Sequence, residues 1–390
     1  MDFKFTEEQE KFRKEVRDFL EGEIKAGTFK PACDAWIAVH SPEFAKKVAA
    51  KGWIGLTWPK EFGGKGRSHV DRLILTEEML RYGAPAGSYW FADRQIGSSI
   101  LKFGTEEQKK ELLPKIISGE GSFGLGMSEP EAGSDLASLQ TKATEDGDNY
   151  IINGQKVWTS GAHFMNYIYL VARTDPTVPK HKGISEFIVA TNLPGITIRP
   201  LVDITGGLHF NEVFFDAVKV PKKDLIGVKN RGFYQILEQL DYERSGMERL
   251  MANFPLFQGL VKYCKDTRRN GKPLCQDPII RSRLAQLQID FEVGRLLTYR
   301  VASVMEQGKA PNYEAAMAKA YDTVFEQRLA GAAIEILGLY GQLVEGSKLV
   351  PIEGMASYDY LMSQGYSLQA GTTEVLRNVI AQRGLGLPSQ

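Results

Sequence analysis

From Tyr150 to Gly161 the chain reads YIINGQKVWTSG, and this stretch decides the fold class. It opens with a short run of aromatic and β-branched residues, a composition that favours a strand. Asn153 and Gly154 follow directly, and this pair favours a tight turn. Further short runs of the same composition lie at residues 167–171, 186–189, 196–198 and 212–215. Because turn residues separate the runs, as at 145–148 and 193–195, the region predicts a small all-β domain.

On both sides of this region the hydrophobic residues repeat with a helical period. The tetrapeptide Thr-Glu-Glu-Gln occurs at residues 6–9 and again at 105–108, each time with the spacing of a helix capping box. After Gly232 the helical period returns, and the stretches 277–304 and 313–339 contain no strong turn signal. The order is therefore helical, β, helical. The predicted domains are a helical domain at 1–120, a β domain at 121–228 and a second helical domain at 229–390.

Composition and charge exclude several classes of protein. The 390 residues include 48 basic and 48 acidic side chains, so the formal net charge is zero. A balanced charge gives no electrostatic footprint for nucleic acid. No apolar run approaches the roughly 18 residues that span a bilayer, and the N-terminus resembles neither a secretory signal nor a transit peptide. We therefore expect a cytoplasmic protein without nucleic-acid or membrane partners.

The cysteines and histidines predict no metal site. Cys33, Cys264 and Cys275 are widely separated in the sequence. The five histidines never fall at the spacing that places two ligands on one helical face. A zinc site and a disulfide framework are both unexpected in such a chain.

Three segments together resemble the motifs of one enzyme family. Residues 127–135 read MSEPEAGSD, residues 152–161 read INGQKVWTSG and residues 370–378 read AGTTEVLRN. In this order and spacing they closely resemble the acyl-CoA dehydrogenase family. The resemblance implies an α+β fold with an N-terminal helical domain, a central small β-barrel or sandwich domain and a C-terminal four-helix-bundle domain. It also implies FAD, an acyl-CoA substrate, an electron-transfer flavoprotein as partner and a homotetramer, with a heterotetramer as an alternative.

The resemblance assigns roles to residues of the first two motifs. Ser128 would bond the pyrimidine side of the flavin, Ser160 would lie near flavin N5, and Trp158 would pack against the ring. Ser134 would lie beside the pantetheine arm of CoA. Simpler interpretations stay open: Trp158 could be a half-buried strand aromatic, and Ser134 with Asp135 could cap a turn.

The catalytic base is expected at Glu243. Removal of the weakly acidic α-proton of a thioester needs a carboxylate. Many family members carry this Glu just before the Gly-Thr of the third motif, where this chain has Ala370. Members that resemble isovaleryl-CoA and long-chain dehydrogenases carry it on an earlier helix, before an Arg, where this chain has Glu243 and Arg244. The alternative is that Glu243 and Arg244 belong to a solvated charge run. Glu374 is not expected to be the base.

The far end of the cofactor is less well matched. The family's Arg, aromatic, Gly, x, Pro segment corresponds here to residues 267–273, where the aromatic is missing. The family's Gln-x-x-Gly-Gly-x-Gly segment corresponds to residues 335–341, where Glu335 stands in place of the Gln. The residues expected to bind cofactor in these segments and the third motif are Arg268, Glu335, Gly338, Thr372 and Glu374. Arg244 and Gly371 are expected beside the substrate.

The predicted function is α,β-dehydrogenation of an acyl-CoA to a trans-2-enoyl-CoA, with electrons passed to the flavoprotein. Two alternatives stay open. The degraded cofactor-tail motifs favour a non-catalytic subunit of a hetero-oligomer, whereas Glu243, Ser128, Trp158 and Ser160 oppose it. A flavin monooxygenase on the same fold is the other alternative, against which Arg244 and Ser134 argue weakly.

Overall fold

The computed structural model describes residues 4–243 and 246–388, with the side chains of 241–243 left out. The chain forms two compact units. The first, here called the helical unit, comprises Met1–Trp36, Ser68–Ala84 and Arg244–Gln390. The second, the sheet unit, comprises Ile37–Arg67 and Pro85–Glu243. The helices of the first 120 residues therefore divide between the two units. The domain boundaries expected at 120/121 and 228/229 stay a prediction.

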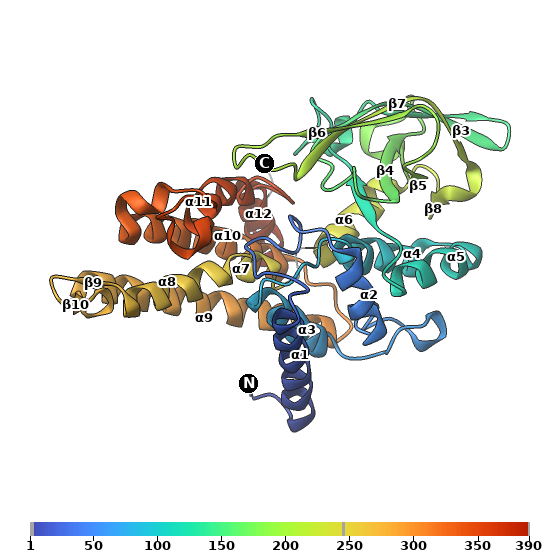
Figure 1. The fold of residues 1–390 in the computed structure, drawn as a ribbon. Helices are drawn as coiled ribbons and strands as arrows, with labels where there is room; N and C mark the ends of the chain where they lie inside the picture. Colours follow the sequence, from blue (N-terminus) through green and yellow to red (C-terminus); the bar gives the residue numbers. More distant parts are fainter. Residues whose placement is uncertain (1–3, 244–245, 389–390) are drawn as a thin grey trace. The chain divides into compact units, whose positions relative to one another are not determined.

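The sheet unit is built around an eight-stranded sheet (Figure 1). Its strands are β1 (Phe123–Gly126), β2 (Lys142–Asp146), β3 (Asn149–Lys156), β4 (Tyr167–Arg173), β5 (Ile184–Ala190), β6 (Ile196–Leu201), β7 (Phe210–Pro221) and β8 (Leu225–Ile226). Their order is β6-β7-β3-β2-β4-β5-β8, and β1 pairs in parallel with β4. The predicted β domain is confirmed, with a sheet that stays open among the described residues.

One face of this sheet carries the core of the unit. Ile152, Leu170, Phe187 and Val213, each from a different strand, are fully buried in one cluster. Alternate residues of a strand point to the same face, so a period of two places these side chains together. The helices of the unit are α2 (Pro42–Ala50), α4 (Gly97–Phe103), α5 (Glu106–Ile117) and α6 (Gly232–Glu243), with the 3-10 helix η1 (Lys60–Phe62), the π-helical η2 (Ala92–Ile96) and short 3-10 turns at η3 (Leu136–Ser138), η4 (Lys180–Lys182) and η5 (Lys222–Asp224).

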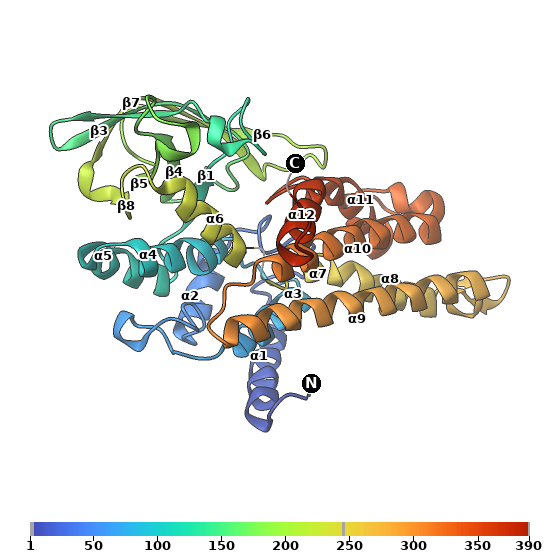
Figure 2. The same ribbon diagram turned by 180° about the vertical axis from the view of Figure 1, so that it is seen from behind.

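The helical unit is organised around two long helices. These are α9 (Pro278–Glu306) and α10 (Tyr313–Leu337), which confirm the two long helical stretches read from the sequence. Figure 2 shows α10 beside α11 (Met355–Tyr366), and the two pack together. The remaining elements are α1 (Glu7–Lys25), α3 (His69–Arg81), α7 (Glu248–Met251), α8 (Phe254–Asp266), β9 (Arg268–Arg269), β10 (Lys272–Pro273), η6 (Leu274–Gln276), η7 (Gly338–Gln342), η8 (Pro351–Gly354), α12 (Thr373–Val379) and η9 (Ile380–Gly384).

Helix starts follow the capping chemistry of the sequence. Thr6 and Thr105 each accept a hydrogen bond from the backbone of the Gln three residues later, and each Gln side chain reaches back. Both predicted capping boxes are therefore confirmed. A third, formed by Ser68 and Asp71 at the start of α3, follows the same rule with Asp in place of Glu or Gln.

Two local predictions were wrong. Asn153 and Gly154 do not form a turn but lie inside β3, where the pairing with β7 shifts by one residue. A side chain at 154 would collide with Thr141, since a Cβ there would lie 2.5 Å from its Oγ1. Gly here allows close backbone approach at a bulge rather than a turn. The short hairpin β9–β10 also interrupts a region expected to be helical throughout.

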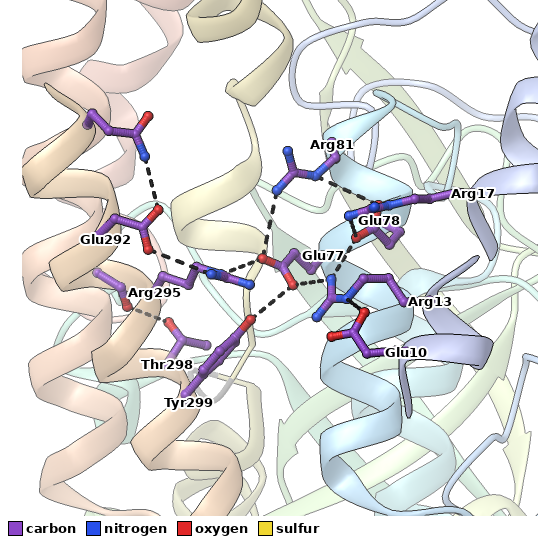
Figure 3. A network of polar contacts seen from close by, with 12 residues as sticks. Glu10, Arg13, Arg17, Glu77, Glu78, Arg81, Glu292, Arg295, Thr298 and Tyr299 are labelled. Carbon is purple, nitrogen blue, oxygen red and sulfur yellow. Dashed lines mark hydrogen bonds and ion pairs between the residues drawn. The ribbon is translucent and has the colours of Figure 1, made fainter. Parts of the chain in front are cut away.

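A buried ion network ties three helices of the helical unit together (Figure 3). Glu77 on α3 accepts hydrogen bonds from Arg13 of α1 at 2.6 Å, from Arg295 of α9 at 2.7 Å and from the Tyr299 hydroxyl at 3.1 Å. Its neighbour Glu78 accepts from Arg13 at 2.6 Å. Both carboxylates are fully buried. Burial without such partners would be costly, so the two glutamates and their cations hold α1, α3 and α9 in one register.

Among the residues that the structure describes, no helix is long and apolar enough to cross a membrane. Within the same part of the chain, no cluster of three or more His, Cys, Asp or Glu side chains could hold a metal ion.

Candidate active site

The first two motifs meet inside the sheet unit through a buried ion pair. Lys156, the last residue of β3, is fully buried and donates to Glu129 at 2.8 Å and to the carbonyl of Met127 at 3.0 Å. Glu129 also accepts from the backbone N–H of Thr141 at 2.9 Å. Burial alone would raise the pKa of Glu129, but Lys156 outweighs it and holds the pKa below its ordinary value. This pair fixes the loop of the first motif against the strand that leads into the second.

The sequence assigned no role to Glu129 or Lys156. Both lie within the quoted motifs, so their position was visible, but nothing in the spacing links a residue of one motif to a residue of the other. Their charge gave the only available signal, because a Lys that becomes buried needs a partner of opposite charge.

Trp158 lies just beyond β3 on a turn with unusual backbone geometry. Its φ is +60°, a left-handed conformation that is a genuine outlier for a bulky residue. The preceding residue, Val157, donates its N–H to the carbonyl of Ser128 at 2.9 Å. The indole is 59% exposed and meets Phe210 edge-on at 5.7 Å between ring centroids. A half-buried strand aromatic would be neither so exposed nor in this conformation, so the turn presents the ring outwards.

Two serines lie close to this turn: Ser160 two residues after Trp158, and Ser128 through the hydrogen bond from the N–H of Val157 to its carbonyl. Ser128 and Ser160 are both partly exposed, and neither side chain makes a hydrogen bond within the described residues. An exposed aromatic face beside unpaired hydroxyls suits a flat heteroaromatic ligand, which stacks on the ring and takes hydrogen bonds at its edge. These residues therefore fit a flavin ring.

Ser134 lies on the exposed part of the first-motif loop. The neighbouring Asp135 accepts from Lys180 at 2.6 Å and from Ser138 at 2.6 Å. The hydrogen bond from Lys180 holds the pKa of Asp135 below its ordinary value. Asp135 thus stabilises the turn itself, and Ser134 keeps the exposure that a ligand contact would need.

The third motif forms the start of α12 in the helical unit. Ala370 and Gly371 have φ values of +55° and +94°, so the chain turns sharply there. Thr372 caps the helix by accepting from the N–H of Val375 at 3.2 Å. Lys319 of α10 is fully buried and donates to the carbonyl of Gly371 at 2.9 Å, which stabilises the turn. Glu374 is exposed on the first helical turn.

The residues expected at the cofactor tail lie in two other parts of the helical unit. Arg268 is exposed in the β9–β10 hairpin and donates to the carbonyl of Gly271 at 3.0 Å. Glu335 is exposed near the end of α10 and forms an ion pair with Arg283 of α9. Gly338 ends α10 with a φ of +60°. Glu335 therefore has a partner of its own, and its assignment to the cofactor stays a prediction.

The expected base closes the last helix of the sheet unit. Glu243 is the final residue of α6, and its side chain lies outside the described part of the chain. Arg244 lies outside it altogether. The roles of both residues stay predictions.

A surface groove of about 660 Å³ between α2 and α5 contains none of these residues. It is lined by Lys46, Ala49, Ala50, Glu61, Phe62, Gly63, Lys109, Lys110, Pro114, Ile117 and Ser118. The motif geometry, rather than this groove, marks the candidate active site of the sheet unit.

Comparison with known proteins covers nearly the whole chain. Residues 6–120 match the acyl-CoA dehydrogenase N-terminal domain, residues 124–218 the middle domain and residues 230–385 the C-terminal domain. The acyl-CoA dehydrogenase FadE29 of Mycobacterium tuberculosis is 35% identical over 356 residues, which cover 90% of each chain.

Solved structures agree with the sequence relatives. One described as "Tcur3481-Tcur3483 steroid ACAD" superposes with a TM-score of 0.91 at 32% identity and covers all of both chains. The ChsE4–ChsE5 complex of Mycobacterium tuberculosis gives a TM-score of 0.87 at 31% identity, again over both entire chains. The fold, the motif geometry and these matches lead to one conclusion: the chain belongs to the acyl-CoA dehydrogenase family, whose members are flavin-dependent oxidoreductases that dehydrogenate acyl-CoA thioesters.

Proposed function

We propose that this chain binds FAD and forms a trans-2-enoyl-CoA from a bulky, ring-bearing acyl-CoA, with Glu243 as the base. The observation that carries the proposal is the turn at Trp158, which presents an exposed indole and is joined by backbone contacts to Ser128 and Ser160. FAD, when bound, would supply the acceptor for the hydride that leaves the substrate β-carbon. The chain itself must hold the ring, orient the thioester and remove the α-proton.

The absence of a carboxylate at position 370 of the third motif supports Glu243 as the base. Ala370 carries only a methyl group at the position where many relatives carry the base, so it cannot take a proton. Its left-handed backbone and the buried Lys319 keep the turn in shape without a carboxylate. A base is nevertheless needed to remove the α-proton. Glu243, at the end of α6 and before Arg244, is the residue that the family resemblance offers in its place.

The substrate class follows from the same substitution and from one structural relative. A carboxylate at 370 would occupy space that Ala370 leaves open, which suits a bulky acyl group. The relative with a TM-score of 0.91 is described as a steroid acyl-CoA dehydrogenase. We therefore propose a thioester with a fused-ring or comparably wide acyl group. Ser134, Arg244 and Gly371 would contact the CoA thioester.

Assembly and electron transfer are part of the proposal. We propose a tetramer in which Arg268, Glu335, Gly338, Thr372 and Glu374 reach the adenine and pyrophosphate end of FAD, and an electron-transfer flavoprotein as acceptor. The departures at 267–273 and 335–341 favour a tetramer of two different chains. Both structural relatives have names that pair two components, which supports this version.

The central experiment is anaerobic bleaching of the yellow holoenzyme by acyl-CoAs. Wild-type protein is mixed with straight, branched, aryl and steroid acyl-CoAs, and flavin reduction is followed by absorbance. Glu243→Gln should slow bleaching by the best substrate by about 10²–10⁴-fold, because the amide has no useful basicity. Asp241→Asn removes a nearby acid in the same way and should leave the rate close to wild type.

Each outcome decides between readings. If Glu243→Gln keeps a tenth of the wild-type rate, Glu243 is not the base. If straight-chain thioesters bleach the flavin faster than steroid ones, the substrate class is wrong. A protein that is colourless alone but yellow when co-expressed with a second family member supports the two-chain tetramer, and light scattering then gives its mass.

A further inference from the structure

We infer that Asn211 and His163 are positioning residues that hold the Trp158 turn in its ligand-binding shape. The inference rests on the proposed contact between Trp158 and the flavin. Neither residue lies within a motif quoted above, and neither side chain needs to touch substrate or cofactor to act in this way. All the contacts that follow lie within the sheet unit.

The turn needs external support because its backbone is strained. A bulky residue held at a φ of +60° is strained, and this conformation persists only when the surrounding structure enforces it. Trp158 cannot supply that support itself, since its indole is mostly exposed and packs only edge-on against Phe210.

Asn211 clamps the residue that follows Trp158. The N–H of Thr159 donates to the Asn211 carbonyl at 3.1 Å, and the Asn211 side-chain amide donates back to the Thr159 carbonyl at 2.8 Å. Asn211 and Thr159 are both fully buried. Gly124 of β1 makes room for the Thr159 methyl, because a Cβ at 124 would approach it to 3.2 Å. Both polar groups of the Thr159 backbone are therefore fixed by one residue of β7.

His163 contacts the Asn211 amide on the side away from Thr159. Thr159 offers a carbonyl oxygen, which can only accept, so the amide nitrogen must face it and the amide oxygen must face away. That oxygen lies 2.8 Å from His163 Nδ1. Nδ1 must therefore carry a hydrogen and donate, which fixes the tautomer of a neutral ring. Without this donor, the buried amide oxygen would lose its partner and the clamp would lose its preferred orientation.

Aromatic packing holds the His163 ring in turn. Its centroid lies 3.8 Å from that of Phe164, and Phe164 stacks on His40 at 4.9 Å with nearly parallel planes. His40 Nδ1 lies 3.0 Å from the Ser88 hydroxyl, which also accepts from the backbone N–H of Ser41. A continuous series of contacts thus leads from the start of α2 to the strained turn.

The test measures flavin binding rather than turnover alone. Asn211→Asp keeps the shape but replaces the donor that faces the Thr159 carbonyl by an acceptor. FAD affinity, measured by titration of the apoprotein, should fall about tenfold, the usual effect of losing one buried hydrogen bond. The same amide-to-acid change in Asn153→Asp is the matched control. Asn153 only accepts from the N–H of Ala217 with its side-chain oxygen, so FAD affinity should stay at the wild-type value.

His163 gives a second test in case Asn211→Asp fails to fold. His163→Leu removes the Nδ1 donor, whereas His163→Asn places an amide N–H near the same point. The leucine variant should lose FAD affinity about tenfold and the asparagine variant should recover most of it. Acrylamide quenching of the apoproteins reports on the turn directly, because Trp158 is 59% exposed, whereas the exposed fraction of each of the other four tryptophans is 5% or less. The quenching constant should differ from the wild-type value in the leucine variant and return to that value in the asparagine variant.

Trp158→Ala distinguishes a failure of the proposed flavin contact from a failure of the proposed positioning role. If this variant binds FAD as wild type does, the proposed flavin contact has failed. If it binds FAD more weakly while Asn211→Asp and His163→Leu stay within twofold of wild type, the flavin contact stands and the positioning role is overturned. When both ideas hold, Asn211→Asp adds little to the loss already caused by Trp158→Ala.

Discussion

Glu77 and Glu186 are both fully buried glutamates, yet their surroundings are opposite. Glu77, in the helical unit, accepts hydrogen bonds from two arginines and a tyrosine. Glu186, on β5 of the sheet unit, accepts from the side-chain amide of Gln235. The Tyr169 hydroxyl is its other polar neighbour, and no cation lies within ion-pair distance of it among the described residues.

The two carboxyl groups respond to burial in opposite directions. Burial alone would raise the pKa of Glu77, but Arg295 and Arg13 outweigh it and hold the pKa below 4.5. Burial raises the pKa of Glu186 to about 8, and the bond from Gln235 opposes this only in part. The difference teaches that burial does not determine the charge of a carboxyl group. The cations that the fold brings to it do, and at neutral pH Glu77 is charged while Glu186 is mostly protonated.

The largest expected effect comes from removing the charge of Glu77. Glu77→Gln removes a fully buried carboxylate that Arg13 and Arg295 share, leaves Arg13 with Glu78 alone as its buried partner, and should lower the free energy of unfolding by about 3–5 kcal/mol. Denaturant unfolding at pH 7 measures the loss. Glu10→Gln is the matched control, since Glu10 is half exposed and lies 3.8 Å from Arg13. It should change stability by no more than about 1 kcal/mol.

The pH dependence of this loss has a definite sign. Since the folded-state pKa of Glu77 is depressed, its contribution is present above pH 4.5 and is lost as the pH falls through the folded pKa. The difference between wild type and Glu77→Gln should therefore shrink in acid. A difference that stays constant from pH 7 to pH 3 would mean that the glutamine fails for steric reasons instead.

A smaller effect of opposite sign is expected at Glu186. Because its folded-state pKa is raised to about 8, wild-type stability is complete below pH 4.5 and declines as the pH rises towards 8. Glu186→Gln imitates the protonated acid and removes this decline. It should stabilise the protein by on the order of 2–3 kcal/mol at pH 7 and change little at pH 4. Glu212→Gln, on strand β7 of the same sheet, makes the same change at a partly exposed carboxylate and should show no such gain. Destabilisation by Glu186→Gln at pH 7 would show that the carboxylate is charged there.

The smallest effect on stability is expected at Trp158, whose side chain is mostly exposed and contacts Phe210 edge-on. Trp158→Ala should leave the unfolding midpoint of the apoprotein nearly unchanged. It should weaken FAD binding by about 1.4 kcal/mol, roughly tenfold in Kd, through the lost ring contact. Trp158→Phe keeps an aromatic face and should recover part of the affinity. An apoprotein that unfolds much more easily without the indole would place Trp158 among the structural residues with Glu77.

Local chemistry could be predicted from the sequence where the partners are close along the chain. The capping boxes at Thr6 and Thr105 join residues three apart, and both were predicted. The period of the apolar residues predicted α9 and α10 almost to their ends, because a long helix repeats one pattern many times. Asn153 and Gly154 were misread because the same pair suits a hairpin turn and a bulge, and only the approach of Thr141 decides between them.

The rest depends on pairing between distant parts of the chain. Nothing in the sequence around Glu77 or Glu186 shows which one has cations, since Arg295 lies 218 residues from Glu77. The motifs identified Trp158 and its two serines, but its left-handed backbone follows from Asn211, 53 positions further on, and from no local signal. Ligand-binding residues were easier to find than the residues that hold them, because the ligand's chemistry constrains only the former.

The separation between Glu77 and Arg295 also has a consequence for biosynthesis. At roughly 5–20 residues per second, a ribosome needs about 10–40 s to add the 218 residues between them. During that time Glu77 and Glu78 can already pair with Arg13, but α9 does not yet exist to complete the network. The sheet unit, which ends at Glu243, can be finished while the helical unit still waits for its third segment. In the nascent chain the two glutamates therefore pair with Arg13 and Arg17 of α1 and with Arg81 of α3, and a truncation that removes α1 would leave them with Arg81 until the last quarter of the protein has been made.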